Sequence, residues 1–98
     1  MNALAIYQAL VRLPNLPVCF TPAGAGESYE VTHLEHGEDG IALECSGNGA
    51  GMLSQEVLSW IAEYAPNADI VVNVPAYGVE KAEVLKVQLQ EGWIELLG

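Results

Sequence analysis

A glycine-rich stretch near the middle of the chain, residues 46–52, constrains the fold more than any other feature. Gly47, Gly49 and Gly51 fall within five consecutive positions. Glycine loses more backbone entropy than any other residue when it is held in a helix or strand. The stretch therefore predicts a hinge, residues 47–52, between an N-terminal unit, residues 1–46, and a C-terminal unit, residues 53–98.

The two units carry matching patterns, which favours an internal repeat. Pro14-Asn15 precedes Pro66-Asn67 by 52 residues, and the same offset places the apolar run 18–20 on 70–72. One further residue of offset aligns four more apolar positions: Val31 with Val84, Leu34 with Val87, Ile41 with Ile94, and Leu43 with Leu96. We interpret the chain as a single domain, residues 1–98, built from two αβββ units. A chance match between apolar-rich strands is the alternative.

The pattern within each unit predicts an α+β fold, with antiparallel sheets and two helices packed on one side. Helices are expected at 3–13 and from Ser54, as N-cap, to just before Pro66. Strands are expected at 16–21, 28–36, 40–46, 69–74, 82–90 and 92–97. The apolar stripes expected to face the core are Leu4, Tyr7, Leu10 and Val11 on the first helix, and Val57, Leu58, Ile61 and Tyr64 on the second.

The middle strand of each unit breaks its apolar alternation at the same place. Val31 is followed by Leu34, and Val84 by Val87, so the spacing is three residues rather than two. A regular strand cannot present both members of such a pair on one face. The spacing therefore predicts a β-bulge in each unit.

Chain length and cysteine content limit the class of protein. Each half has fewer than about 50 residues, too few to bury an adequate core alone, so the halves are expected to pack on each other. No apolar run reaches the roughly 18 residues that a membrane span needs, and no basic segment at the N-terminus indicates a signal peptide. Two cysteines are too few for a disulfide scaffold and suggest a reducing cytoplasm.

The motifs of enzymes and metalloproteins are weak in this chain. Residues 47–51 have the glycines of a phosphate-binding loop but no neighbouring lysine. His33, Glu35, His36 and Cys45 hint at a zinc site, but alternation places the two histidines on opposite faces, so we interpret His36 as a partly buried structural residue. Cys19 and Cys45 fall at packing positions. We expect no catalytic residues, metal or cofactor; a histidine beside Cys45 or a carboxylate in a cleft would indicate an enzyme instead.

Charge is the most informative property. Thirteen acidic residues against three basic ones give a formal net charge of −10. Six of the acids fall within residues 27–44, where there is no lysine or arginine: Glu27, Glu30, Glu35, Glu38, Asp39 and Glu44. Such a chain repels nucleic acid and anionic membranes and is attracted to basic protein surfaces. A solvated surface that only keeps the protein soluble is the alternative.

In size, net charge and the acidic cluster at 27–44, the chain resembles small acidic inhibitors of phages and mobile elements, namely anti-CRISPR proteins and other DNA mimics, and acidic immunity proteins. The resemblance rests on no motif. It implies a non-enzymatic binding protein that occupies a basic surface of a nucleic-acid-binding protein or nuclease. The six acids of the cluster are the expected partner-binding residues.

A second hypothesis is a structural module that assembles with itself. Trp93 points away from the face of Ile94 and Leu96, and Val71, Trp93 and Leu97 could together form a second apolar face. A sheet that is apolar on both faces must be covered twice. This hypothesis predicts a homodimer and assigns the acidity to solubility alone.

Overall fold

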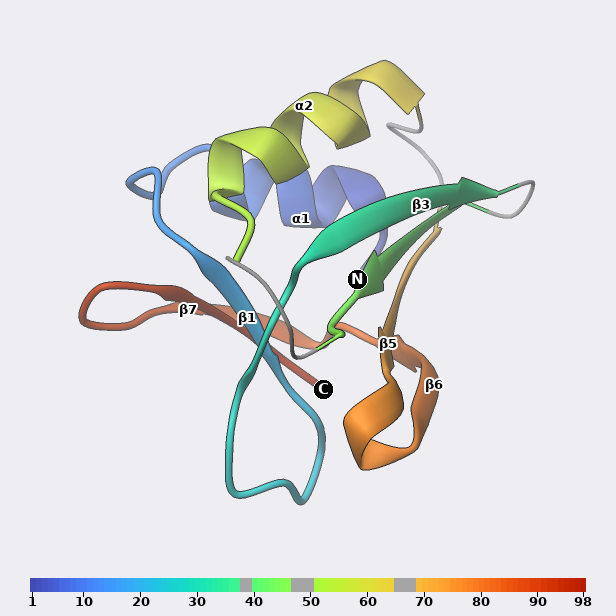
Figure 1. Cartoon of the computed structure of the whole chain (residues 1–98). Helices are drawn as coiled ribbons and strands as arrows, with labels where there is room; N and C mark the ends of the chain where they lie inside the picture. Colours follow the sequence, from blue (N-terminus) through green and yellow to red (C-terminus); the bar gives the residue numbers. More distant parts are fainter. Residues whose placement is uncertain (38–39, 47–50, 65–68) are drawn as a thin grey trace.

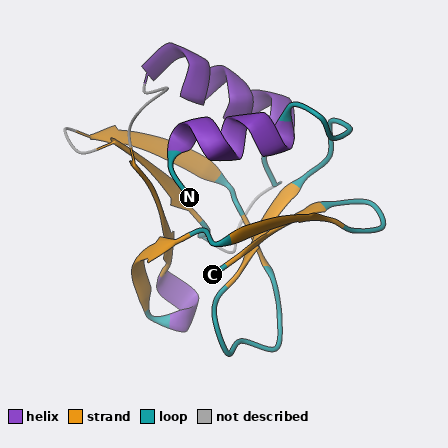
Figure 2. Ribbon diagram, turned by 180° about the vertical axis from the view of Figure 1, so that it is seen from behind, coloured by secondary structure: helices purple, strands orange, loops and turns teal. Residues whose placement is uncertain are grey.

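The computed structural model describes residues 1–37, 40–46, 51–64 and 69–98. Its α+β class is as expected: two α-helices lie side by side on one side of two four-stranded sheets (Figures 1 and 2). The helices are α1 (Ala3–Leu10) and α2 (Ser54–Tyr64), with a short 3-10 helix η1 (Pro75–Tyr77). The strands are β1 (Val18–Thr21), β2 (Tyr29–Glu30), β3 (His33–Gly37), β4 (Gly40–Glu44), β5 (Asp69–Val74), β6 (Val79–Glu83), β7 (Lys86–Leu89) and β8 (Ile94–Leu97).

Each sheet takes strands from both halves of the chain. One sheet has the order β2-β1-β8-β7 and the other β3-β4-β5-β6. The two central pairs, β1 with β8 and β4 with β5, are parallel, whereas the outer pairs are antiparallel. The expectation of purely antiparallel sheets is therefore wrong, while the expectation that the halves pack on each other is confirmed. Most of the predicted hinge lies outside the described residues.

The predicted middle strands are each split in two, which corrects the six expected strands to eight. The chain passes from β2 in one sheet to β3 in the other, and likewise from β6 to β7. Consecutive amides make the crossing: Val31 N–H donates to the Val18 carbonyl, and Thr32 N–H donates to the Glu44 carbonyl. The three-residue apolar spacing thus marks a change of sheet with fully buried Val31 at its corner, and not the predicted bulge.

The core lies between the sheets and the helices. Its register is regular: Val18 pairs with Ile94 and Phe20 with Leu96. Ile41 pairs with Ile70 and Leu43 with Val72 in the other sheet. All eight side chains are buried. Because these contacts join strands far apart in the chain, burial of this apolar surface holds the two halves together.

The buried face of α1 differs from the predicted stripe. Ala3, Ile6 and Leu10 are buried, whereas Leu4 and Val11 are exposed. Residues 3–11 are apolar on nearly every side, so two stripes with the same helical spacing compete and the local pattern does not choose between them. On α2, Val57 and Ile61 are buried as expected, but Tyr64 is exposed.

The start of α2 is stabilised by the other half of the chain. Ser54 is the first helical residue and not the predicted N-cap; its buried hydroxyl donates to the Pro14 carbonyl. The Asn15 carbonyl oxygen accepts a hydrogen bond from Gln55 N–H at 3.0 Å. Asn15 thereby satisfies one of the amides that a helix start leaves unpaired. Neither α1 nor α2, the α-helices of the described chain, has the length and apolar character needed to cross a bilayer.

Candidate functional site

The β3-β4-β5-β6 sheet has an outer face that neither α1 nor α2 covers, and we call it the open face. Strand alternation sends Ile41, Leu43, Ile70 and Val72 into the core and the intervening residues outward. In register across the four strands, one outward row reads Glu35, Ala42, Val71 and Glu83. The neighbouring rows bring Asp69 opposite Gly40, and His33 and Asn73 on either side of Glu44.

Small residues leave a hollow in this face. Its lining includes Gly37, Gly40 and Ala42 together with the charged residues Glu35, Asp69 and Lys81. The hollow has a volume of about 340 Å³. A second hollow of about 480 Å³, lined by Glu44, Asn73 and Glu80, adjoins the first at Lys81. The open face is therefore concave on both sides of Lys81.

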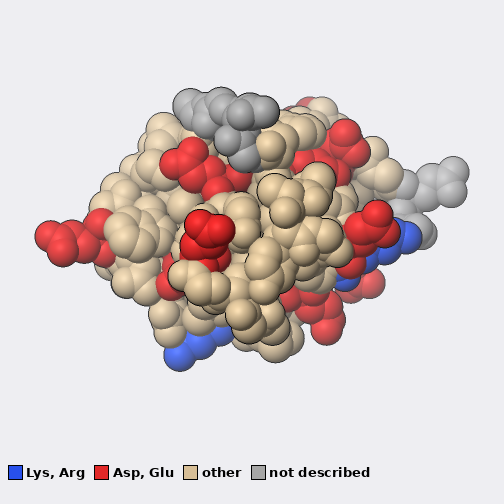
Figure 3. All heavy atoms as spheres, turned by 60° about the horizontal axis from the view of Figure 1, so that its bottom comes forward, with Lys and Arg blue, Asp and Glu red and all other residues tan. Residues whose placement is uncertain are grey.

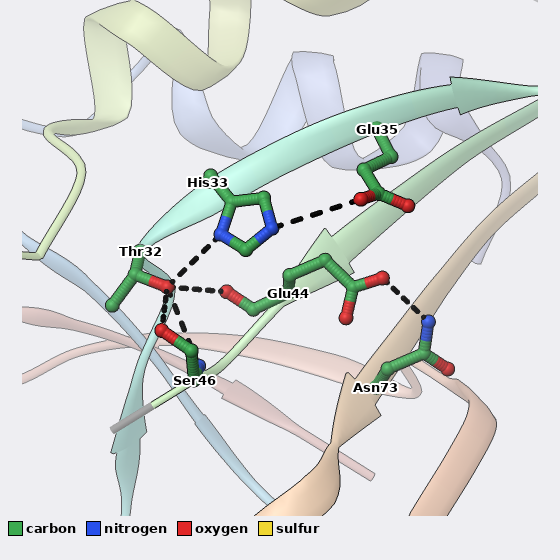
Figure 4. A network of polar contacts seen from close by, with 6 residues as sticks. All are labelled: Thr32, His33, Glu35, Glu44, Ser46 and Asn73. Atoms are coloured by element: carbon green, nitrogen blue, oxygen red, sulfur yellow. Dashed lines mark hydrogen bonds and ion pairs between the residues drawn. The ribbon is translucent and has the colours of Figure 1, made fainter. Parts of the chain in front are cut away.

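A polar network holds the side chains at one end of the open face (Figure 4). The Thr32 hydroxyl donates to the Glu44 carbonyl oxygen at 3.1 Å and lies 2.8 Å from Ser46 Oγ and 3.3 Å from His33 Nδ1. His33 Nε2 is 3.8 Å from Glu35 Oε1. These two side chains remain 52 % and 67 % exposed, so water solvates both. The network orients these groups on an exposed surface.

Asn73 ties three strands together beneath Lys81. Its amide nitrogen donates to Glu44 Oε1 at 2.9 Å, and its carbonyl oxygen accepts from Lys81 N–H at 2.8 Å. The β5–β6 register shifts between Val72 and Val74, and Lys81 has a φ of 52°, in the left-handed region that non-glycine residues rarely adopt. Asn73 thus fixes both the Glu44 carboxylate and the backbone that carries Lys81.

The structure brings only part of the predicted acidic cluster together. Glu35 and Glu44 lie on the open face, but Glu30 lies in β2, opposite Cys19 in the other sheet. Glu27 precedes β2 and accepts a hydrogen bond from the Tyr29 hydroxyl. Glu38 and Asp39 lie outside the described residues. The four described acids of the cluster are therefore divided between Glu27 and Glu30 near one sheet and Glu35 and Glu44 in the other, because the chain changes sheets at 31–32.

Acidic residues from the second half complete the open face instead. Asp69 and Glu83 join Glu35 and Glu44 there. Alternation in the predicted strand 69–74 places Asp69, Val71 and Asn73 on one face, but no local signal shows that this strand pairs with β4. Figure 3 shows carboxylates in several separate groups, with only two basic patches on the side in view. The excess of negative charge is thus general, and among the described residues the open face has five carboxylates, those of Glu35, Glu44, Asp69, Glu80 and Glu83, beside Lys81.

The three residues expected to drive self-association do not share a sheet. Val71 lies in β5 on the open face, whereas Leu97 lies in β8 and Trp93 just before it. The grouping fails because the two units do not form separate sheets; each unit contributes strands to both. The exposed apolar side chains of the helix layer, Leu4 and Val11, were instead predicted to be buried.

The two cysteines lie in the core, whereas the two histidines are exposed. Cys19 and Cys45 are buried, as their packing pattern predicts. Burial raises the pKa of the Cys19 thiol to about 11 and that of Cys45 to about 12, so both are protonated at neutral pH. His36 is exposed rather than partly buried, and its ring lies 5.0 Å from that of Tyr64. Within the described ranges, no three His, Cys, Asp or Glu side chains could jointly hold a metal ion.

The outer face of the β2-β1-β8-β7 sheet carries a hydrogen-bonded carboxylate, that of Glu95. At its centre Glu95 lies between Cys19 and Gln88. Its carboxylate accepts hydrogen bonds from Thr21 at 2.6 Å and Gln90 at 2.8 Å, and a longer one from Ser28. The hydrogen bond from Thr21, helped by those from Gln90 and Ser28, lowers the pKa of Glu95. This carboxylate is satisfied within the fold and has a structural role.

Glu95 gives stability a pH dependence of known sign. Because its folded-state pKa lies below the ordinary value of 4.5, the ionised carboxylate stabilises the fold above that value, and the contribution is lost as the pH falls through the folded pKa. In the wild type the free energy of unfolding should fall as the pH is lowered into the acid range. We expect this fall to be smaller in Glu95→Gln. Urea titrations at a series of pH values measure it, with the exposed Glu91→Gln as control. The same acid slope in wild type and Glu95→Gln would contradict the network.

Comparison with known proteins gives no relative: no family model, curated protein or solved structure matches this chain.

Proposed function

We propose that this chain is a non-enzymatic, acidic binding protein that docks on a basic surface of another protein, one that normally holds nucleic acid, and that the open face is its docking surface. The observation that carries the proposal is the make-up of this face. It is concave, neither α1 nor α2 covers it, and its described residues include five carboxylates beside Lys81. An inhibitor of the anti-CRISPR or immunity-protein kind would use such a surface.

The carboxylates supply attraction and orientation, and the apolar floor supplies contact area. A net charge of −10 speeds the encounter with a basic protein and disfavours nucleic acid and anionic lipid. Asn73 and the Thr32 network hold Glu44 and His33 in place before a partner arrives, which limits the side-chain entropy lost on binding. Ala42 and Val71 lie between the acidic strands and can be covered by the partner.

We further infer that the scaffold is a duplicated αβββ unit, with the halves related by an approximate two-fold axis. The hydrogen-bond register supports this inference. Thr32 N–H donates to the Glu44 carbonyl as Leu85 N–H donates to that of Leu97, at an offset of 53 residues in both donor and acceptor. The strand orders support it too. If β1 to β4 of the first half correspond to β5 to β8 of the second, exchanging the halves turns the order β2-β1-β8-β7 of one sheet into the order β6-β5-β4-β3 of the other.

Charge neutralisation tests the docking surface. The triple variant Glu35→Gln, Glu44→Gln and Asp69→Asn is expected to bind a labelled, arginine-rich peptide about 3- to 100-fold more weakly than the wild type, because each exposed ion pair contributes roughly 0.2–1 kcal/mol. Fluorescence anisotropy at low and at physiological salt measures the affinity, which should weaken as salt rises.

The matched control removes the same charge elsewhere. Glu56, Glu63 and Glu91 are exposed and lie on α2 and the β7–β8 turn. Replacing all three by glutamine removes three negative charges, as many as the open-face triple variant loses. A general charge effect would therefore weaken binding by both triple variants alike. Equal affinity for the two triples, or tight binding by the open-face triple, would refute the docking surface.

Self-association remains the second candidate, now placed on the helix layer. Leu4 and Val11 of α1 are 42 % and 53 % exposed, and a wholly apolar hollow of about 210 Å³ lies between Leu4, Tyr7, Ile61 and Ala62. These residues suit contact with a second copy because residues 3–11 carry no charge. Sedimentation equilibrium separates the candidates: a stable dimer favours the assembly module, and a monomer favours the binding protein.

A further inference from the structure

We propose that the hollow on the open face receives an arginine side chain of the basic partner, between Glu35 and Asp69. This inference rests on the proposed docking function and names the group that the surface recognises. It begins from a difference between the two sheets: their strands are arranged in the same way, but the side chains on their outer faces differ.

The position that Glu95 fills in one sheet is occupied by alanine in the other. Glu95 lies on β8 between Cys19 and Gln88, and Ala42 lies on β4 between Val71 and Glu35. The Glu95 side chain reaches across its face to Thr21 and Gln90. The methyl group of Ala42 reaches nothing comparable, and the hollow of about 340 Å³ opens beside it. A group supplied by the partner can therefore occupy space that the first sheet fills by itself.

The rim of the hollow selects a cation. Glu35 projects from β3 and Asp69 from β5, on either side of β4. Glu35 pairs with Ala42 and Asp69 with Gly40, so their backbones are two strands and two residues apart, about 12 Å. Two flexible acidic side chains can both reach a planar group held between them. Lys81, also at the rim, forms no ion pair with any carboxylate among the described residues. The local charge is thus negative and not neutralised from within the described chain.

The shape of the site favours arginine over lysine. A guanidinium is planar and offers five N–H donors that can serve two carboxylates at once. Its aliphatic stem can lie on apolar surface such as Ala42 and Val71 while its head stays at the rim. An ammonium is a compact, strongly hydrated charge and gains less from two separated acceptors.

Filling the hollow tests the inference. The full-length protein, labelled with ¹⁵N, is titrated with the tripeptide acetyl-Gly-Arg-Gly-amide and with its lysine and citrulline counterparts. We expect the arginine peptide to shift the amide signals of Gly37, Gly40, Ala42 and Val71. The lysine peptide should bind at least about threefold more weakly than the arginine peptide. The citrulline peptide, whose side chain is uncharged, should cause no shift. Equal affinity for arginine and citrulline would overturn the proposal.

The decisive variant is Ala42→Glu, which copies Glu95. It adds a negative charge, so long-range attraction alone predicts tighter binding, whereas occupation of the hollow predicts loss of the arginine-induced shifts. Ala42→Gln fills the same space without charge and keeps the test valid if Ala42→Glu does not fold. Gln88→Glu adds the same charge to the other sheet, so it should keep the arginine-induced shifts and bind at least as tightly as the wild type.

The outcomes also separate this inference from the docking proposal. If Ala42→Glu and Ala42→Gln keep full affinity for the labelled, arginine-rich peptide while the open-face triple variant loses it, the hollow is refuted and the docking surface stands. If the wild type binds neither peptide, both proposals fail. Loss of binding in both filled variants, with Gln88→Glu unaffected, supports the hollow.

Discussion

Replacing Phe20 by alanine is expected to lower the free energy of unfolding by about 3–5 kcal/mol, the usual cost of deleting a buried phenylalanine ring. Phe20 is fully buried in β1 and pairs with Leu96 of β8, across the join between the halves. A Cβ atom added at Gly98 would lie 2.8 Å from its ring, so the end of the chain packs directly against it. Small domains are stable by only about 5–15 kcal/mol, so this single substitution should remove a large fraction of the total stability.

Urea unfolding followed by circular dichroism measures this loss. Leu89→Ala is the control, because Leu89 is 51 % exposed in β7 and its truncation should cost less than about 1 kcal/mol. If Phe20→Ala cost no more than Leu89→Ala, the join between β1 and β8 would not be the core of the fold.

The sequence predicts the buried faces of the strands because alternation is a local property. Val18 and Phe20, or Ile41 and Leu43, can be assigned to one face from their spacing alone, and the structure buries all four. The pairing of strands, in contrast, is not determined by local sequence. Val18 pairs with Ile94, and Ile41 with Ile70, in parallel pairs that join distant parts of the chain. Adjacency in sequence favoured antiparallel hairpins, and only the outer strands follow it.

The candidate site shows the same limit. Glu30 and Glu35 are five residues apart and were predicted to share a surface, but the crossover at Val31 and Thr32 places them in different sheets. Asp69 and Glu83 reach the open face through the β4–β5 pairing, which the local pattern does not reveal. The hollow depends on Ala42, a residue with no chemical signal of its own, and becomes visible only when β4 is compared with β8.

A circular permutant is expected to keep the fold if the two halves are equivalent. The permutant begins at Met52, runs to Gly98, continues through a linker that repeats residues 46–51, and then runs from Met1 to Cys45. In the native chain, Cys45 precedes the junction at 46–51 and its N–H donates to the Asn73 carbonyl. Met52 follows the junction and its N–H donates to the Val31 carbonyl. Gly98 N–H donates to Thr21 and the Met1 amine to Val84, so the ends of the chain occupy the matching places.

The free energy of unfolding of this permutant should therefore lie within about 1–2 kcal/mol of the wild-type value, because the new linker closes a loop of the same length at a similar entropic cost. A second permutant, opened between Val31 and Thr32 and closed by the same linker, cuts the crossover where consecutive amides bond to the two sheets. We expect it to lose cooperative unfolding, since buried Val31 then becomes a chain end. Circular dichroism and urea titration compare the two. If the permutant that begins at Met52 fails to fold, the ends of the chain are not equivalent to the junction at 46–51, and the duplication is wrong.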